Sequence, residues 1–269
     1  MSQRLVRQQF LGRESDGIFK ELHVGIVGLG GGGSHVAQQL AHVGIGRYTL
    51  VDNDNIEESN SNRLIGGTNA DLQRQTSKCA IAARQIRRLL PDARIRQRRE
   101  LWQNAAETLT DCDIIVGCLD TFDARLQLEA MCRRSLIPYV DLGMDVVEAG
   151  GHYEIFGQVT LSLPEKPCLK CLNVITEDWR ALEAAKYGAT GSRPQVVWSN
   201  GVLASIAVGA IVQLVTPWHG SAPLPLLEYD GNQNTVSPST MVPYIPPSCP
   251  HYATLDNLGD PWFRVKGRK

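Results

Sequence analysis

The residues best suited to chemistry begin with a glycine cluster. In VGIVGLGGGGSHVAQQL (24–40), Gly28, Gly30 and Gly33 satisfy G-x-G-x-x-G between an apolar run and a helical pattern, and Gly31 continues the turn. Glycines at these positions allow a phosphate to approach backbone amides at a helix N-terminus. The pattern predicts a nucleotide site that suits a nicotinamide coenzyme and ATP equally well. A tight turn without any ligand would need the same glycines.

Acidic and basic side chains follow the next apolar run. Asp52 lies about twenty residues beyond the glycines, where a ribose-binding acid is expected. The segment DNDNIEESNSNR then supplies Asp54, Asn60 and Arg63. The acids suit ribose or a metal, and Asn60 and Arg63 suit a triphosphate. A solvated, helix-capping loop is the alternative, because Asp and Asn favour such positions. A dehydrogenase leaves this segment unexplained.

A closely spaced cysteine pair, Cys168 and Cys171, forms a C-x-x-C motif. In a cytosolic chain this spacing favours half of a tetrahedral zinc site over a disulfide. A redox C-x-x-C is the alternative, but no strand and helix of the thioredoxin kind surround the pair.

The elements that must position these residues alternate up to about residue 143. Apolar runs in HVGIVGL, GRYTLVDND, DCDIIVGCLD and IPYVDLGMD predict strands, and ARIRQRREL predicts a weaker one. Helical spacing over 33–43, in LQRQTSKCAIAARQIRRLL and in TFDARLQLEAMCRRSL predicts the helices between them. We therefore predict an α/β fold: a Rossmann-like, mostly parallel sheet with helices on both faces.

The pattern changes beyond this point. GGHYEIFGQVTLSL alternates like an antiparallel strand, and PLPLLEYDGNQNTVS predicts two strands around a D-G turn. Between them lie a polar stretch over roughly 173–195 and an apolar helix in VVWSNGVLASIAVGAIVQLV. Residues 1–20 read as a helical lead-in and 256–269 as a tail, so we place the main domain at 21–255.

Composition narrows the class of protein. The chain has 269 residues and a formal net charge of -1, without the basic footprint of a general nucleic-acid binder. Its apolar runs read as shorter than a bilayer requires, and its polar N-terminus is no signal peptide. We expect a cytoplasmic protein that acts at no membrane and binds no nucleic acid directly.

Four motifs together resemble the ThiF-type adenylating enzymes, which include molybdopterin-synthase adenylyltransferase and the active half of ubiquitin-activating enzymes. DNDNIEESNSNR is most similar to the ubiquitin-activating members. RLVRQ (4–8), Lys78 and Asp120 match further family motifs in the same order. The resemblance spans roughly 4–250 and implies attack of a carboxylate on the α-phosphorus of ATP, with release of pyrophosphate.

The resemblance also implies roles for the charged residues. Arg63 and Lys78 would contact the phosphates, and Asp120 would hold Mg²⁺. Arg7 would reach the γ-phosphate, supplied in homodimeric relatives by the neighbouring subunit. Taken singly, the two cations of Lys78 and Arg7 fit a solvated surface, and Asp120 fits a helix cap.

The remaining nucleotide contacts come from the same comparison. Asp52 would bind the ribose hydroxyls with Asp54 nearby, and Asn60 would assist in the nucleotide pocket. One position departs from the pattern, because Leu64 follows Arg63 where the family usually has Gln.

In the family a second cysteine pair completes the zinc site. Here the corresponding segment reads SCPHY, in which Cys249 is present and Tyr252 is a poor zinc ligand. We therefore expect a structural Zn²⁺ site formed by Cys168, Cys171, Cys249 and His251. Residues 172–200 would form the family's crossover loop over the substrate tail.

The implied function is ATP-dependent adenylation of the C-terminal glycine of a ubiquitin-like or sulfur-carrier protein, in a homodimer. A bacterial ubiquitin-like conjugation pathway would fit. The chain has no cysteine between Cys171 and Cys249 to accept a thioester, so a conjugating enzyme or sulfur donor would take the acyl group. Alternatives are adenylation of a peptide or tRNA-linked carboxylate, or a non-catalytic partner subunit of the same fold.

Overall fold

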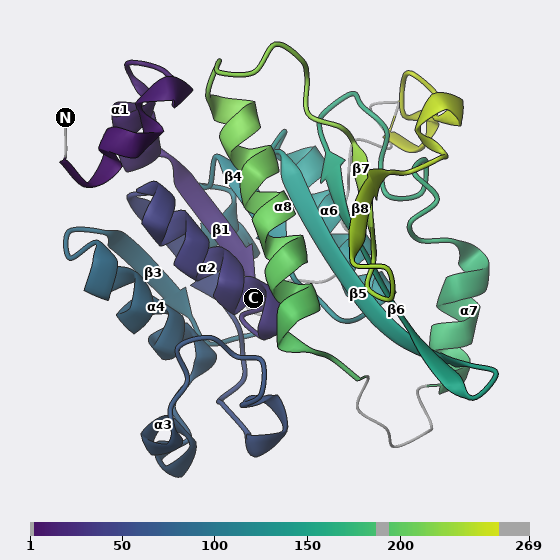
Figure 1. Cartoon of the computed structure of the whole chain (residues 1–269), viewed down its shortest axis with the longest axis horizontal. Coiled ribbons are helices and arrows are strands. Elements are labelled where there is room, and N and C mark those ends of the chain that lie inside the picture. Colours follow the sequence, from purple (N-terminus) through teal and green to yellow (C-terminus); the bar gives the residue numbers. More distant parts are fainter. Residues whose placement is uncertain (1–2, 187–193, 253–269) are drawn as a thin grey trace, which may run out of the picture.

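The structure is a computed structural model that describes residues 3–186 and 194–252 (Figure 1). One eight-stranded sheet runs through it in the order β3-β2-β1-β4-β5-β6-β7-β8. The first five strands in this order are parallel, and β6, β7 and β8 are antiparallel. The strands are β1 His23–Val27, β2 Arg47–Val51, β3 Arg94–Arg98, β4 Ile114–Gly117, β5 Tyr139–Ala149, β6 His152–Ser162, β7 Leu226–Asp230 and β8 Thr235–Pro238. The predicted fold class is confirmed.

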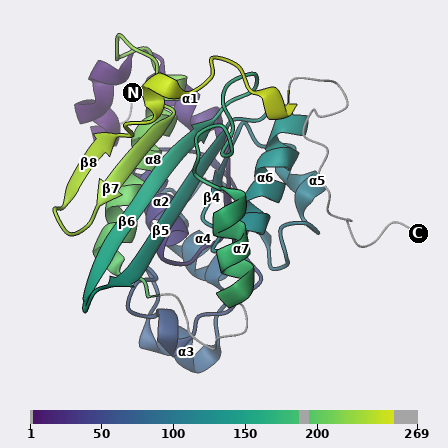
Figure 2. The same ribbon diagram turned by 90° about the vertical axis from the view of Figure 1, so that its right-hand side faces the viewer.

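Helices cover both faces of this sheet (Figures 1 and 2). On one face α2, α4 and α8 lie side by side, and on the other α5 and α6 pack under β4 and β5. The helices are α1 Ser15–Glu21, α2 Gly31–Val43, α3 Asn69–Arg74, α4 Lys78–Leu89, α5 Ala106–Leu109, α6 Phe122–Arg134, α7 Glu177–Lys186 and α8 Val197–Val215, with 3-10 turns η1 Gln3–Leu11, η2 Glu58–Asn60, η3 Val242–Tyr244 and η4 Pro250–Tyr252.

The hydrophobic core has two layers, one on each side of the parallel strands. The larger fills the space between the sheet and α2, α4 and α8, and includes Ile26, Leu40 and Ile211. The second lies between the sheet and α5 and α6, and includes Leu109 and Leu126. Because β1 is buried along its whole length, its carboxyl end is a fixed base for the glycine loop.

The helix predicted from LQRQTSKCAIAARQIRRLL is interrupted. Gln75 adopts a left-handed conformation with φ 49° at the end of α3, and α4 begins only at Lys78. The Ser77 hydroxyl accepts a hydrogen bond from the Ala80 amide at 3.2 Å, which satisfies one of the donors at the new helix start. The prediction of one continuous helix was wrong, because the spacing of apolar residues does not indicate where one helix ends and the next is capped. The break places Lys78 at the first residue of a helix.

The hairpin of β5 and β6 is longer than predicted. Each strand has 11 residues, and they pair along their full length from Tyr139 with Ser162 to Ala149 with His152. Gly150 and Gly151 make the turn with φ values of 60° and 87°. The outer half of the hairpin therefore projects beyond the ends of the parallel strands (Figure 2).

Other expected elements are partly placed. The lead-in consists of η1 and α1, and the polar stretch over 173–195 contains α7. The tail over 256–269 lies outside the described residues.

Helix α8 is long and apolar enough to cross a membrane by length and composition alone, with 19 residues and a mean hydropathy of 1.6. The expectation that apolar runs fall far short of a bilayer was wrong for this helix. In this structure α8 packs against α2, β5 and β6, and 39% of its apolar window is buried. Core helices of water-soluble proteins pass the same test.

Candidate active site

A cavity of about 1230 Å³ opens where the parallel strands end. The glycine loop, the segments after β2 and β4 and the inner face of the antiparallel strands form its walls. Most of the expected site residues line it: Gly28, Gly30, Gly31, Asp52, Asp54, Asn60, Arg63, Lys78 and Asp120. Gly33 and Arg7 lie outside this lining.

The glycines of the loop suit their positions for different structural reasons. Gly28 has φ +85°, and a Cβ there would lie 2.4 Å from the carbonyl oxygen of Cys118. A Cβ on Gly33 would lie 1.9 Å from the Gly28 carbonyl oxygen, so Gly33 lets α2 start against the loop. A Cβ on Gly30 would meet nothing within 4 Å, which leaves its backbone open toward the cavity. The N-terminus of α2 is thus accessible to an anion.

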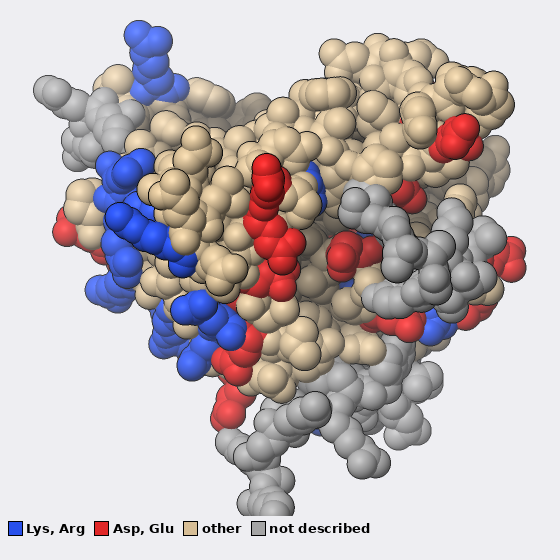
Figure 3. Space-filling view, turned by 90° about the horizontal axis from the view of Figure 1, so that it is seen from below, with Lys and Arg blue, Asp and Glu red and all other residues tan. Residues whose placement is uncertain are grey.

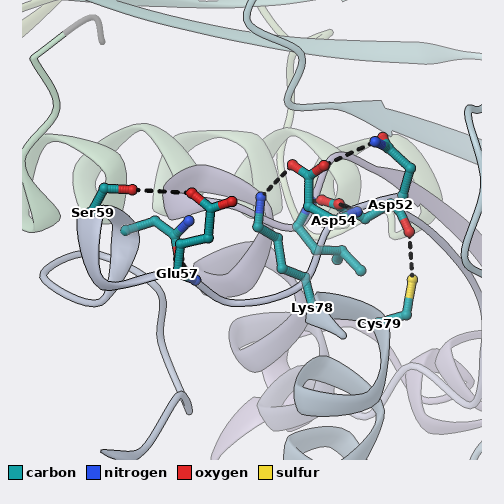
Figure 4. Close-up of polar contacts among 9 residues, drawn as sticks. Asp52, Asp54, Glu57, Ser59, Lys78 and Cys79 are labelled. Atoms are coloured by element: carbon teal, nitrogen blue, oxygen red, sulfur yellow. Dashed lines mark hydrogen bonds and ion pairs between the residues drawn. The ribbon is translucent and has the colours of Figure 1, made fainter. Parts of the chain in front are cut away.

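Two aspartates follow β2 and differ in environment. Asp52 is 9% exposed, and its two carboxylate oxygens accept hydrogen bonds from the amides of Leu29 (2.7 Å) and Asp54 (2.8 Å). Burial raises its pKa, opposed by the charge of Lys78 and the two amides. The Asp54 carboxylate instead pairs with the Lys78 ammonium at 2.7 Å (Figure 4). Asp52 therefore fixes the glycine loop, and Asp54 holds the lysine at the cavity wall.

Asn60 is the last residue of η2, and Arg63 lies in the turn that follows it. The Arg63 Nη1 donates to the Ser59 carbonyl oxygen at 2.7 Å and to the Asn62 side chain at 3.1 Å, and partial burial lowers its pKa. The Asn60 side-chain oxygen accepts a hydrogen bond from the Glu57 amide at 3.0 Å, so it shapes this turn. The capping alternative therefore describes part of what Asn60 does.

The packing of Leu64 accounts for the leucine at a position where the family usually has Gln. It is 5% exposed and packs with Ile56 and Ile81 in a small apolar cluster beneath the loop. A leucine at this position contributes packing between the loop and α4 in place of a polar contact.

Asp120 and Arg7 lie on different parts of the surface. Asp120 is exposed at the cavity wall after β4, and the N-cap of α6 is Thr121, whose hydroxyl accepts from the Ala124 amide. The helix-cap alternative for Asp120 is therefore not what the structure shows. Arg7 is exposed on η1, beside the exposed side chains of Val6 and Phe10.

Sequence reasoning missed a buried ion pair in the cavity wall. Arg125 on α6 and Asp141 on β5 are 5% and 0% exposed, and the guanidinium contacts both carboxylate oxygens. The Tyr139 hydroxyl donates to the same carboxylate at 2.9 Å. A charged residue inside the apolar run IPYVDLG was the available signal, because a buried carboxylate requires a partner.

A second missed residue is Asn200, in the first turns of α8. It is 6% exposed, lines the cavity and donates to the Val196 carbonyl oxygen at 2.9 Å. A Cβ on Gly31 would lie 2.6 Å from its side-chain nitrogen, so α8 presses directly on the glycine loop. An asparagine within an otherwise apolar helix was the sequence signal.

The predicted metal ligands come together away from the cavity. One ligand atom each from Cys168, Cys171, Cys249 and His251 lies within 4.8 Å of every other. The sulfur of Cys171 lies 3.6 Å from those of Cys168 and Cys249, and 3.3 Å from the His251 Nδ1. Tetrahedral zinc with bonds of about 2.3 Å to sulfur requires sulfur separations of about 3.7 Å. The donor set and its spacing therefore fit Zn²⁺.

Buried polar residues support this cluster from α6. The Glu129 carboxylate accepts hydrogen bonds from the Leu169 amide (2.9 Å) and the Ser162 hydroxyl (2.5 Å). Burial raises the pKa of Glu129 to about 7. Arg133 donates to the Pro167 carbonyl oxygen at 2.9 Å, and its guanidinium lies over the ring of Tyr252. Tyr252 thus contributes packing where the family has its fourth cysteine.

Comparison with known proteins identifies the family to which this chain belongs. The ThiF family model matches residues 2–251. The chain belongs to the ThiF family. Among its relatives in this family, the SAMP-activating enzyme E1 of Haloferax volcanii is 34% identical over 164 residues, covering 60% of this chain and 57% of that protein.

Other relatives carry different names. The ubiquitin-like modifier-activating enzyme 5 of Drosophila willistoni is 30% identical over 149 residues, or 50% of this chain and 36% of its own. The tRNA threonylcarbamoyladenosine dehydratase of Escherichia coli K12 is 31% identical over 129 residues, 47% of each chain. This ThiF-family chain therefore spans roughly a third to three-fifths of the lengths of these relatives.

Solved structures show the same fold. The crystal structure of E. coli MccB with ATP has a TM-score of 0.72 and 19% identity, covering 90% of this chain and 72% of the other. MccB with succinimide gives a TM-score of 0.73 at 20% identity, with the same coverage. The ThiF-type fold expected from the sequence is thus confirmed across most of the chain.

Proposed function

We propose that this protein is an ATP-dependent adenylyltransferase that activates the C-terminal glycine of a ubiquitin-like or sulfur-carrier protein and releases pyrophosphate. The observation that carries the proposal is one cavity that combines the glycine loop, Lys78, Arg63 and Asp120 with the wall of an antiparallel sheet. Family membership and the names of the SAMP-activating and ubiquitin-like modifier-activating relatives support it.

The chemistry requires two anions to meet. A carboxylate oxygen attacks the α-phosphorus, and the bond from that phosphorus to the pyrophosphate oxygen breaks. The Lys78 ammonium exchanges Asp54 for phosphate oxygens, while Arg63, bonded in the described structure only through Nη1, offers its remaining N–H groups. Fixed cations in a recessed site lower the repulsion between the reactants without reorganising water. Backbone amides of the glycine loop add to this field.

Asp120 would hold Mg²⁺. Its carboxylate is exposed at the end of a parallel strand beside the glycine loop, and a hard cation prefers oxygen ligands of this kind. The ion supplies charge neutralisation on the phosphate oxygens when bound. Asp52, already ordered by two amides, would accept hydrogen bonds from the ribose hydroxyls on its remaining lone pairs.

The acyl-adenylate would pass to a nucleophile on a partner, either a conjugating enzyme or a sulfur donor. Cys79, Cys112 and Cys132 are buried, and three other cysteines form the metal cluster. Cys118 lines the cavity, but burial raises the pKa of its thiol, which disfavours the thiolate that would attack. None of the seven cysteines, all of which lie in the described ranges, forms a disulfide, which suits a reducing cytoplasm.

We also propose a homodimer in which Arg7 completes the partner's cavity. Arg7 does not line the cavity of its own chain and lies on a surface with Val6 and Phe10, which are 51% and 67% exposed. The Phe10 ring packs edge-on against Trp218, itself 45% exposed, at the end of α8. Exposed aromatic and aliphatic side chains in one place indicate a protein interface.

Exchange of labelled pyrophosphate into ATP tests the activity directly. We expect exchange with a carrier protein that ends in Gly-Gly, and a loss of at least about 100-fold in Lys78→Ala and Asp120→Ala, because each removes a charge that acts on the transition state. Lys20→Ala, an exposed lysine on α1, is the matched control and should leave exchange unchanged. If a short peptide or a tRNA drives exchange and carrier proteins do not, the substrate is that peptide or tRNA and not a carrier protein. Binding of NAD without binding of ATP would overturn the proposal.

A further inference from the structure

The wall formed by β5 to β8 differs in charge from the rest of the molecule. The chain has 27 lysines and arginines, yet none occurs in residues 139–162 or 226–252, which contain these four strands. Four carboxylates of this region line the cavity: Asp145, Glu154, Glu228 and Asp230. In the view from below the molecule, basic side chains gather toward the left edge of the face, away from the right-hand side where Figure 1 places β5 to β8 (Figure 3).

Sheet register places these carboxylates on one side of the sheet. Asp145 pairs with Phe156, which pairs with Asp230, and the next row joins Gly143, Gln158 and Glu228. Residues paired across a ladder point to the same face, and so do residues two apart along a strand. The acids therefore form rows on the cavity face.

Within residues 3–186 and 194–252, the groups that contact these carboxylates neutralise little of their charge. Glu154 lies 3.6 Å from the exposed His152, and the Asp230 carboxylate accepts from the amides of Asn232 and Gln233, which are neutral. In the described part of the chain Glu228 makes no ion pair. Among the described residues, Arg125 is the arginine that lines the cavity on this side, and it is paired with Asp141. The wall thus presents net negative charge to whatever lies on it.

The positions of these carboxylates along the strands indicate which residues of a bound tail they would contact. Asp141 is level with Gly117, the last residue of β4, and therefore with the ends of the parallel strands. At about 3.3 Å per residue, Glu228 lies about 7 Å, Asp145 about 13 Å and Glu154 about 20 Å beyond that level. An extended tail whose last carboxylate reaches the glycine loop would meet these acids about two to six residues from its end.

We propose that this wall selects a carboxyl-terminal tail that carries lysine or arginine within about six residues of its last glycine. The proposal rests on the proposed function, since it deepens the assignment of the same cavity. Opposite charges favour the basic tail, and a tail with acidic side chains at those positions is repelled. Phe156, 38% exposed in the same rows, adds an apolar contact for the stems of such side chains.

Peptide binding tests the selection without requiring catalysis. Fluorescein-labelled Ala-Arg-Ala-Arg-Ala-Gly-Gly, the same peptide with alanine for arginine and the same peptide with glutamate for arginine are titrated with the full chain in the absence of ATP. Fluorescence anisotropy should show the arginine peptide binding at least about 5-fold more tightly than the alanine peptide, and the glutamate peptide more weakly than either.

Charge-removing variants locate the effect. Glu228→Gln and Glu154→Gln should each reduce the preference for arginine about 2- to 5-fold, as expected for one partly solvated charge pair. Glu14→Gln, an exposed glutamate on the opposite side at the start of α1, should leave it unchanged. Equal affinities for the three peptides, or no binding of any, would overturn the proposal. Loss of pyrophosphate exchange with every carrier would instead count against the adenylation activity.

Discussion

At the scale of single residues, the two aspartates after β2 show how neighbours in sequence acquire different tasks. Asp52 is buried with both oxygens bonded to backbone amides, whereas Asp54 is 53% exposed and bonded to Lys78. The motif DNDN alone does not distinguish the roles of the two aspartates. Only the folded chain shows that the first holds the loop and the second holds a cation.

This difference predicts unequal costs of substitution. Asp52→Asn replaces one acceptor oxygen by a side-chain amide NH2 group that faces the backbone amide of Leu29 or Asp54, leaving a buried N–H without an acceptor. We expect a loss of about 1 to 3 kcal/mol in the free energy of unfolding, measured by urea denaturation. Asp54→Asn removes a partly exposed ion pair and should cost less than about 1 kcal/mol. Equal losses in the two variants would contradict the division of tasks.

At the scale of elements, the metal cluster joins segments that are far apart in the chain. Cys168 and Cys171 follow β6, and Cys249 and His251 flank and occupy η4, about eighty residues later. The segment around η4 is too short to form a hydrophobic core of its own, so a bound ion would supply the energy that holds it in place. Its loss should therefore release η4 from α6.

We expect the purified chain to contain about one zinc per molecule by elemental analysis, and Cys249→Ser or His251→Ala to lose most of it and to melt at a lower temperature. His251→Cys should retain zinc, because thiolate is an equally good ligand. Tyr252→Phe is the matched control, since it keeps the ring over Arg133 and removes no ligand. A metal-free chain whose melting temperature ignores a chelator would contradict the zinc assignment.

Elements also show what the sequence could and could not foretell. Apolar runs predicted most of the strands, and the C-x-x-C spacing of Cys168 and Cys171 predicted half of the cluster, because both signals are local. The other half, Cys249 and His251, was predicted only from the resemblance of SCPHY to the family's second cysteine pair. The break between α3 and α4 was missed because one left-handed residue, Gln75, leaves no trace in apolar periodicity. The Arg125–Asp141 pair was missed because a contact between α6 and β5 is fixed only by packing.

At the scale of the whole molecule, the proposed homodimer rests on the position of Arg7. The γ-phosphate contact proposed for Arg7 would need its side chain at a cavity, but η1 holds Arg7 outside the cavity lining of its own chain, among exposed apolar side chains. A second copy that covers Val6, Phe10 and Trp218 would bury this patch and carry its own Arg7 toward the first cavity. Cavity and interface would then be completed by the same event.

Mixed dimers distinguish this arrangement from action within one chain. Arg7→Ala and Lys78→Ala homodimers should each lack pyrophosphate exchange. When the two variants are co-expressed with different tags and purified through both, one of the two cavities combines an intact Lys78 with the partner's Arg7, so activity should return to about half that of the wild type. If Arg7 acted on its own chain, every cavity of the mixed dimer would lack one residue, and no activity would return. A monomer by light scattering at working concentration would also exclude the arrangement.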